Sequence, residues 1–440
     1  MSGDASVQFS LHLVRRRLTT FFPSSRCMSL KQSALVCLLA CVLGACSAIP
    51  RIPAKGELFG QRVDTTVDSE MARYYLESYL PGKNEDRALD ARIAALYRAH
   101  GQSVPSRDEL KAIAANFSVD FAALFLADRL LNDRCNRELN ERFERFLNDD
   151  AAVDASLTAS YQILFVPGWH YIENGQMTGA DFAEPRALAT RMGFENYLVP
   201  LPQTGAVEES ARVLAAAVAR HSRSGKQIIL AGASSAGPVI HLTLGELLQG
   251  DELESVAAWL NIGGILQGTP FIDYFEKRPQ RWLFDAYVRF KGFDKNAILS
   301  MSTAPSRQRF ARLRLAPDIV VINYMGIPLS GQLGQYSKTG YRMLRPDGPN
   351  DGLALLTDEI VPGSRTVVAL GNDHFFAEDP QIDRKTIALI KLMVSYPDNP
   401  MAAGCTGTPH KRSMTAHLPP GQSRSNTRAA PRRESEIPTE

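Results

Sequence analysis

The chain has 440 residues, of which 45% are hydrophobic and 22% charged, and its formal net charge is +2. This composition is ordinary for a folded globular protein and argues against a disordered chain or a protein that crosses a membrane many times. The small net charge, with no basic helix interleaved with aromatic residues, gives no support for a nucleic-acid partner. At this length the chain could form two or three domains, and one enlarged α/β domain with additions at both ends fits equally well.

Residues 1–45 are expected to be a targeting segment that is absent from the folded domain. Ser33 to Ala45 is uncharged and mostly apolar, follows Lys31, and is too short to span a bilayer, which is typical of the hydrophobic region of a signal peptide. Met28 gives a more compact charged start than Met1, so we expect translation to begin there.

The end of this segment, Leu43-Gly-Ala-Cys46, resembles a lipobox, in which the signal is cleaved before a cysteine that is then acylated. The resemblance implies that Cys46 is the first residue of a lipoprotein of the cell envelope. By the same resemblance, Ser47 favours the outer membrane, with the protein facing the periplasm. An ordinary secretory signal cut near Ala48 is the alternative.

The remaining chain divides by composition into four parts. Residues 46–65 are expected to form a linker and residues 66–155 a helical N-terminal subdomain, in which Asp120 to Leu131 shows apolar residues at helical spacing. Residues 156–397 form the expected α/β domain. Residues 398–440 are rich in Pro, Arg, Ser and Thr and cannot bury enough apolar surface to fold, so they are expected to be a disordered tail.

From Tyr161 onward, short apolar runs alternate with amphipathic helical segments, which is the pattern of βαβ units. The predicted strands are residues 163–166, 197–201, 228–231, 259–266, 319–324 and 366–370. They predict an α/β fold with a mostly parallel central sheet and flanking helices. Residues 271–310 are rich in aromatics and break this rhythm; they form either a cap over the carboxyl edge of the sheet or a simple packed insertion.

The run from Lys226 to Gly237 takes a buried strand through a turn of small residues into a helix. It resembles the nucleophile elbow G-x-S-x-G of the α/β-hydrolases, in which a serine occupies a strained turn between strand and helix. Gly232 and Ser234 match this motif, and Ala236 replaces its second glycine. A shifted frame with Ser235 as nucleophile stays open, although the length of the strand before Gly232 favours Ser234.

The acid and base of a triad are expected downstream, because this family has the chain order Ser, Asp, His. The segment Gly-Pro-Asn-Asp351-Gly resembles the N-D-G segment that carries the triad acid of bacterial lipases. His374 follows the next predicted strand, where the resemblance places the triad histidine. Asp358, in Asp-Glu-Ile-Val-Pro, is the rival acid, but it leaves little room before the strand that begins at Thr366.

The same resemblance implies an oxyanion hole made of two backbone N–H groups. One belongs to Ser235, the residue after the nucleophile, and the other to Trp169, in a turn similar to the family's H-G-x turn. Pro167 replaces the histidine of that turn, which need not impair catalysis because main-chain groups act there. Asn261 to Pro270 is similar to the strand and G-[ST]-P turn that precede the lid of lipases.

Together these motifs imply a lipase-like or esterase-like serine hydrolase that acts on an ester or other acyl substrate, needs no cofactor, and attaches to the membrane through a lipid anchor. The alternatives are an inactive envelope lipoprotein that uses the fold as a binding module, and a thioesterase or amidase with the same triad. No spacing resembles a metal site. Unpaired thiols at Cys135 and Cys405 are favoured over a disulfide between them.

Overall fold

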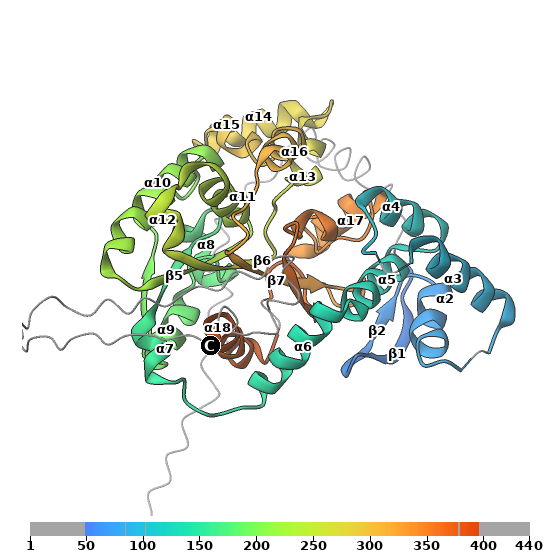
Figure 1. Ribbon diagram of the computed structural model, residues 1–440. Helices are drawn as coiled ribbons and strands as arrows, with labels where there is room; N and C mark the ends of the chain where they lie inside the picture. Colours follow the sequence, from blue (N-terminus) through green and yellow to red (C-terminus); the bar gives the residue numbers. More distant parts are fainter. Residues whose placement is uncertain (1–48, 84, 102, 377–378, 396–440) are drawn as a thin grey trace, which may run out of the picture.

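The computed structural model describes residues 49–83, 85–101, 103–376 and 379–395, and Figure 1 shows how their elements are arranged. The expected signal peptide, the candidate acylation residue Cys46 and the expected tail lie outside the described residues. The predictions for the α/β region and for most of the N-terminal segment fall within them.

A six-stranded sheet forms the centre of the protein in the order β4-β3-β5-β6-β7-β8, and every pair of neighbouring strands in it is parallel. Its strands are β3 (Tyr161–Val166), β4 (Glu195–Leu198), β5 (Gln227–Ala233), β6 (Val256–Ile262), β7 (Val320–Ile327) and β8 (Arg365–Leu370). Each overlaps one of the apolar runs predicted as strands. The predicted α/β class, with a parallel central sheet and flanking helices, is confirmed.

Helices cover both faces of the sheet, because successive residues of a strand point to opposite sides. Along β3, Leu164 packs into a core shared with α10 and α11, whereas Ile163 and Phe165 pack into a second core shared with α6, α9 and α18. These helices are α6 (Arg134–Leu147), α9 (Ala183–Arg191), α10 (Val207–His221), α11 (Ala236–Leu242) and α18 (Ile382–Ser395). Because all neighbouring strands of this sheet are parallel, their carboxyl ends meet at one edge of the sheet. Open α/β sheets bind their ligands at that edge.

Shorter elements connect this framework. They are α7 (Ala155–Ser160), α8 (Tyr171–Thr178), η2 (Ser222–Ser224), η3 (Thr243–Leu247), α12 (Gly250–Glu254), α17 (Ser337–Leu344), η4 (Arg345–Asp347) and η5 (Leu356–Glu359). Between β6 and β7 lie the four helices of the aromatic insertion, α13 (Pro270–Glu276), α14 (Gln280–Lys291), α15 (Lys295–Leu299) and α16 (Thr303–Arg312). Figure 1 shows these four helices grouped together beyond the sheet.

The linker expected at residues 46–65 is where the structure differs most from the sequence prediction. An antiparallel hairpin occupies most of it, made of β1 (Ile52–Leu58) and β2 (Gln61–Val67). Its two-residue loop, Phe59-Gly60, has positive φ angles of 48° and 80°, which match the right-handed twist of a hairpin. The hairpin was missed because polar residues and a glycine interrupt its apolar residues, and few of its residues are fully buried.

The expected N-terminal helical segment is helical and packs directly on the sheet. Its elements are α2 (Glu70–Tyr74), η1 (Tyr75–Tyr79), α3 (Arg87–His100), α4 (Arg107–Asn116) and α5 (Val119–Asn132), followed by α6. Phe121 and Phe125 of α5 share one core with Met325 of β7 and Val368 of β8. The segment is therefore continuous with the α/β core.

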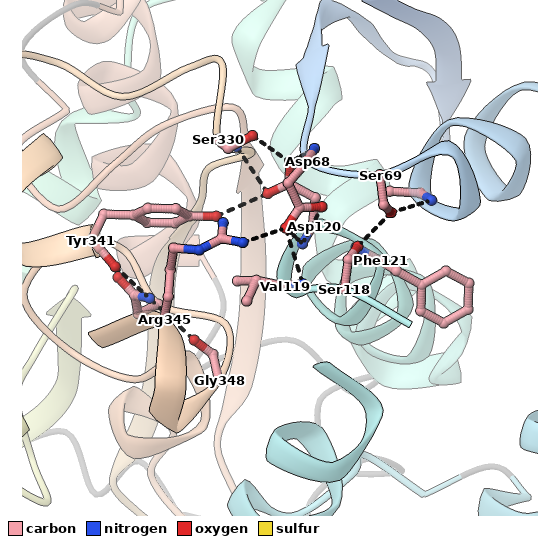
Figure 2. Close-up of polar contacts among 12 residues, drawn as sticks. Asp68, Ser69, Ser118, Val119, Asp120, Phe121, Ser330, Tyr341, Arg345 and Gly348 are labelled. Atoms are coloured by element: carbon pink, nitrogen blue, oxygen red, sulfur yellow. Dashed lines mark hydrogen bonds and ion pairs between the residues drawn. The ribbon is translucent and has the colours of Figure 1, made fainter. Parts of the chain in front are cut away.

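A buried polar network ties this segment to the chain that follows β7 (Figure 2). Asp120 of α5 accepts hydrogen bonds from the Ser330 hydroxyl at 2.6 Å and the Tyr341 hydroxyl at 2.9 Å, and Arg345 forms an ion pair with Asp68 at 3.0 Å. Burial, and then the neighbouring Asp68 carboxylate, raise the pKa of Asp120 to about 7. The network fixes α17 and η4, which lead into the loop that carries Asp351.

The described cysteine, Cys135 in α6, takes part in a disulfide. The expectation of an unpaired thiol at this position is therefore wrong. Sequence spacing does not report which thiols meet in the fold, so it could not decide this point. Within the described ranges, every helix is too short or too polar to pass through a bilayer.

Candidate active site

Ser234 occupies a sharp turn between β5 and α11. Its φ angle is +56°, a left-handed conformation that is costly for a residue with a side chain, by roughly 1–3 kcal/mol. The turn needs small neighbours: a Cβ on Gly232 would lie 2.3 Å from Ile240, and a Cβ on Gly237 would lie 2.8 Å from the Gly264 backbone. The strand and helix therefore hold Ser234 in a strained position at the carboxyl edge of the sheet.

The structure brings the three residues predicted as a triad together. The Ser234 Oγ lies 2.9 Å from His374 Nε2, although 140 residues separate them, and His374 Nδ1 lies 2.5 Å from Asp351 Oδ2. The other oxygen of Asp351 accepts the backbone N–H groups of Leu353 and Ala354 at 2.8 and 2.7 Å. Because these bonds orient Asp351, the carboxylate can fix the tautomer and direction of the imidazole.

The electrostatics of His374 suit a base that must carry a proton for part of a reaction. Burial lowers the pKa of this imidazole, but the Asp351 carboxylate raises it more, so that the pKa lies above its ordinary value. Only 7% of His374 and 1% of Asp351 are exposed. A proton that His374 takes from Ser234 would therefore be stabilised by a charge shielded from water.

The rival acid Asp358 and the rival nucleophile Ser235 do not hydrogen-bond the His374 ring in this arrangement. Asp358 is fully buried, forms an ion pair with Arg107 at 2.6 Å, and has Arg307 at 3.6 Å. Burial raises the pKa of Asp358 and the two arginines oppose that rise. Ser235 lies one residue beyond the turn, as the N-cap of α11, with helical backbone angles. The structure thus places Asp351, rather than Asp358, against the histidine.

The two candidate oxyanion donors belong to neighbouring turns. Trp169 and Ser235 line the same small cavity. Gly168 brings the first turn into contact with the elbow, since a Cβ there would lie 3.8 Å from the Ser234 Cβ. The backbone N–H of His170, the next residue, already donates to a carbonyl oxygen at 2.6 Å. The assignment of the oxyanion donors to the N–H groups of Trp169 and Ser235 stays a prediction.

A second acid beside Asp351 was missed by the sequence analysis. Glu359 is 1% exposed, and its side chain lies near the Asp351 carboxylate, which acts on its pKa. Burial, and then the Asp351 carboxylate, raise the pKa of Glu359 well above its ordinary value. This rise favours the neutral form of the Glu359 carboxyl, and neither of its oxygens has a hydrogen-bond partner among the described residues. Its place in the segment Asp-Glu-Ile-Val-Pro gives no hint that Asp351 lies near it.

Gly263 lies directly against the histidine and the acid. Its φ angle is +51°, and a Cβ there would lie 3.6 Å from His374 Nδ1 and 3.8 Å from Asp351 Oδ2. Across the described ranges, no group of three or more His, Cys, Asp or Glu side chains is arranged to hold a metal ion.

No protein-family model matches the chain, and no curated protein sequence matches it. Among solved structures, a metagenomic carboxyl esterase is 19% identical over 55% of this chain and 76% of its own, with a TM-score of 0.45. The mature Bacillus licheniformis lipase is 16% identical over 56% and 95%, with a TM-score of 0.44. Lipase 1 of Pelosinus fermentans is 13% identical over 52% and 98%, with a TM-score of 0.37. At these values the likenesses say nothing about what this chain does.

Proposed function

We propose that the protein is a serine hydrolase that cleaves carboxylic esters through an acyl-enzyme. The observation that carries the proposal is the continuous contact from the Ser234 hydroxyl, on its strained turn, through His374 to the buried Asp351 carboxylate. A serine hydroxyl is a poor nucleophile at neutral pH and needs a base within hydrogen-bond reach. This arrangement supplies the base and its orienting acid.

In the first half-reaction, Ser234 Oγ attacks the ester carbonyl carbon while His374 Nε2 takes the hydroxyl proton. The carbonyl π electrons move to the oxygen, and the backbone N–H groups of Trp169 and Ser235 stabilise this oxyanion, each by about 10²-fold in rate. The C–O bond to the leaving group then breaks, and His374 gives its proton to the departing alkoxide. An alcohol leaves and Ser234 remains acylated.

In the second half-reaction, water attacks the acyl carbon and His374 takes its proton. The tetrahedral intermediate collapses, the bond to Ser234 Oγ breaks, and His374 returns the proton to Oγ, which releases the carboxylic acid. Asp351 stays ionised throughout and stabilises the imidazolium.

The first test is covalent labelling of the unmodified protein. We expect a fluorophosphonate probe to label Ser234, and p-nitrophenyl esters to be hydrolysed at least about 10⁶-fold faster than without protein. Protein that has been fully labelled should lose this activity in proportion. A matched series of ester, thioester and anilide with one acyl chain then identifies the bond cleaved. Labelling with no turnover of any ester would contradict the proposal, and a chain that takes no label would favour an inactive binding module.

We also propose that Cys46 is acylated and attaches the protein to the cell envelope, on the support of the lipobox-like segment that ends there. Labelled palmitate should then enter the protein in a bacterial host, and Cys46→Ala should abolish the label. Cys41→Ala, which removes a cysteine inside the same segment, should keep it. Equal labelling of the parent and Cys46→Ala proteins would contradict the proposal. Several acyl chains on one residue would hold the protein firmly, whereas one chain binds only marginally.

A further inference from the structure

Helix α14 of the insertion turns an apolar stripe to solvent. The α14 stripe consists of Trp282, Leu283, Tyr287 and Phe290, which are 63%, 42%, 53% and 86% exposed. Four of the ten large hydrophobic residues that are exposed in the described chain lie on this one helix. Their spacing places them on one face, while Val288 is buried on the other. A contiguous exposed stripe of this kind marks a site of interaction.

Positive charge surrounds this stripe. The exposed cations of α14 and its flanks are Lys277, Arg278, Arg281, Arg289 and Lys291. The acid between residues 277 and 291, Asp285, already pairs with Lys295 at 2.5 Å. Among the ion pairs of the described residues, none involves Lys277, Arg278, Arg289 or Lys291. These four cations have no ion-pair partner among the described residues and can meet an external anionic surface, whereas Arg281 lies 3.9 Å from Glu276.

Edge-on aromatic contacts connect the α14 stripe to the candidate active site. Tyr287 of the stripe packs edge-on against Phe293, with ring centroids 6.4 Å apart, and Phe293 packs against Trp169 at 6.3 Å. Trp169 lines the same cavity as Ser235, and its backbone N–H is one of the two candidate oxyanion donors. Figure 1 shows α14 on the outer side of the insertion, facing away from the sheet. A partner seated on α14 would therefore lie over the same end of the molecule as Ser234.

We propose that α14 docks the protein on an anionic lipid surface. Aromatic and aliphatic side chains flanked by lysine and arginine are the composition of a helix that lies in the plane of a membrane interface. Tryptophan and tyrosine prefer the headgroup level, and each cation near an anionic leaflet adds attraction. The stripe enters the interface and the cations contact lipid phosphates, which holds the site beside the bilayer.

The charges disfavour a second copy of this chain as the occupant. In a two-fold dimer the same patch meets itself, so the cations of one α14 would face those of the other, and the acids Glu276 and Asp285 are already paired with Lys295. An acidic protein surface would satisfy the charges but would leave aromatic rings such as Phe290, at 86% exposure, without the apolar medium that a bilayer offers. The lipid surface satisfies both features.

The test measures where Trp282 lies, so it does not depend on the proposed enzymatic activity. The protein is the full chain with Ser234→Ala and Cys46→Ser, which removes the candidate nucleophile and acylation site. It is mixed with phosphatidylcholine vesicles that carry brominated acyl chains, with or without phosphatidylglycerol. We expect tryptophan emission to be quenched only by the anionic vesicles, and Trp282→Phe to remove most of this quenching.

Charge variants give the matched control. In the same background, Arg289→Gln with Lys291→Gln should lower the affinity for anionic vesicles by about 30-fold, at roughly one kilocalorie per cation. Arg87→Gln with Arg98→Gln, which removes two exposed cations from α3, should leave it unchanged. Equal quenching by neutral vesicles, no quenching at all, or equal losses in both double variants would each overturn the proposal. Dimers that Phe290→Ser abolishes, with no quenching, would assign the stripe to a second copy.

Discussion

Replacing Ser234 by alanine should lower kcat for ester hydrolysis by about 10⁶-fold and abolish covalent labelling by a fluorophosphonate. The loss is large because the nucleophile and base act as one unit, so that without Oγ the proton acceptor His374 has nothing to activate. The residual rate would come from the backbone donors and from binding alone. Alanine removes one oxygen at a partly exposed turn, so the thermal unfolding temperature should stay close to that of the parent.

Ser235→Ala is the matched control, since it removes the neighbouring hydroxyl and keeps the backbone N–H assigned to the oxyanion. We expect kcat within about tenfold of the parent, because main-chain donors do not depend on the side chain. Labelling should persist at Ser234. If Ser235→Ala abolished the adduct and Ser234→Ala kept it, the shifted frame of the elbow would be the active one.

The strands and their order along the chain could be predicted because a strand that is buried on both faces of the sheet is a continuous run of apolar residues. β3 is a continuous apolar run, and β5 ends in the small residues that the approach of α11 requires. Both are local consequences of packing, visible without knowledge of any distant residue. The hairpin β1–β2 is the opposite case: it has no continuous apolar run and few fully buried residues, so its sequence signal was weak.

The choice between the two candidate acids depends on partners that are distant in the sequence, so local sequence patterns cannot settle it. Asp351 and Asp358 are both buried and lie in the same connection before β8. What separates them is Arg107, which is 251 residues from Asp358 in the chain and contacts it through Nε at 2.7 Å. Glu359 was missed for the same reason, because its position near the Asp351 carboxylate is defined only once the connection has folded.

The N-terminal helices have a structural part in this arrangement. Arg107 begins α4 and engages Asp358, while Asp120 of α5 binds Ser330 and Tyr341 near the connection that holds Asp351. The segment that offered no chemistry in the sequence therefore supports the loop that presents the acid. Its removal would expose the core that it shares with β7 and β8.

Replacing Asp351 by asparagine should lower kcat/KM by up to about 10⁴-fold while the fold is retained. The amide keeps the size of the carboxylate but cannot hold the imidazole in the tautomer that accepts the serine proton, and it cannot stabilise the imidazolium. Its carbonyl oxygen can still accept the backbone N–H groups of Leu353 and Ala354, so the loop should keep its shape. Steady-state kinetics with one ester, together with circular dichroism, separates the two effects.

The pH profile of kcat/KM for Asp351→Asn tests the role of Asp351 more sharply than the size of the rate loss does. His374 must be neutral to act as a base, so kcat/KM rises as the pH passes upward through its pKa, which Asp351 raises. Asparagine removes the negative charge that raises the pKa of His374, whereas burial still lowers that pKa. The rise of kcat/KM should therefore move to lower pH. Asp358→Asn should instead reduce stability by about 1–3 kcal/mol, because Arg107 loses its partner, and should leave the profile in place. Equal rate losses and equal profile shifts in the two variants would mean that the orienting acid is not Asp351 alone.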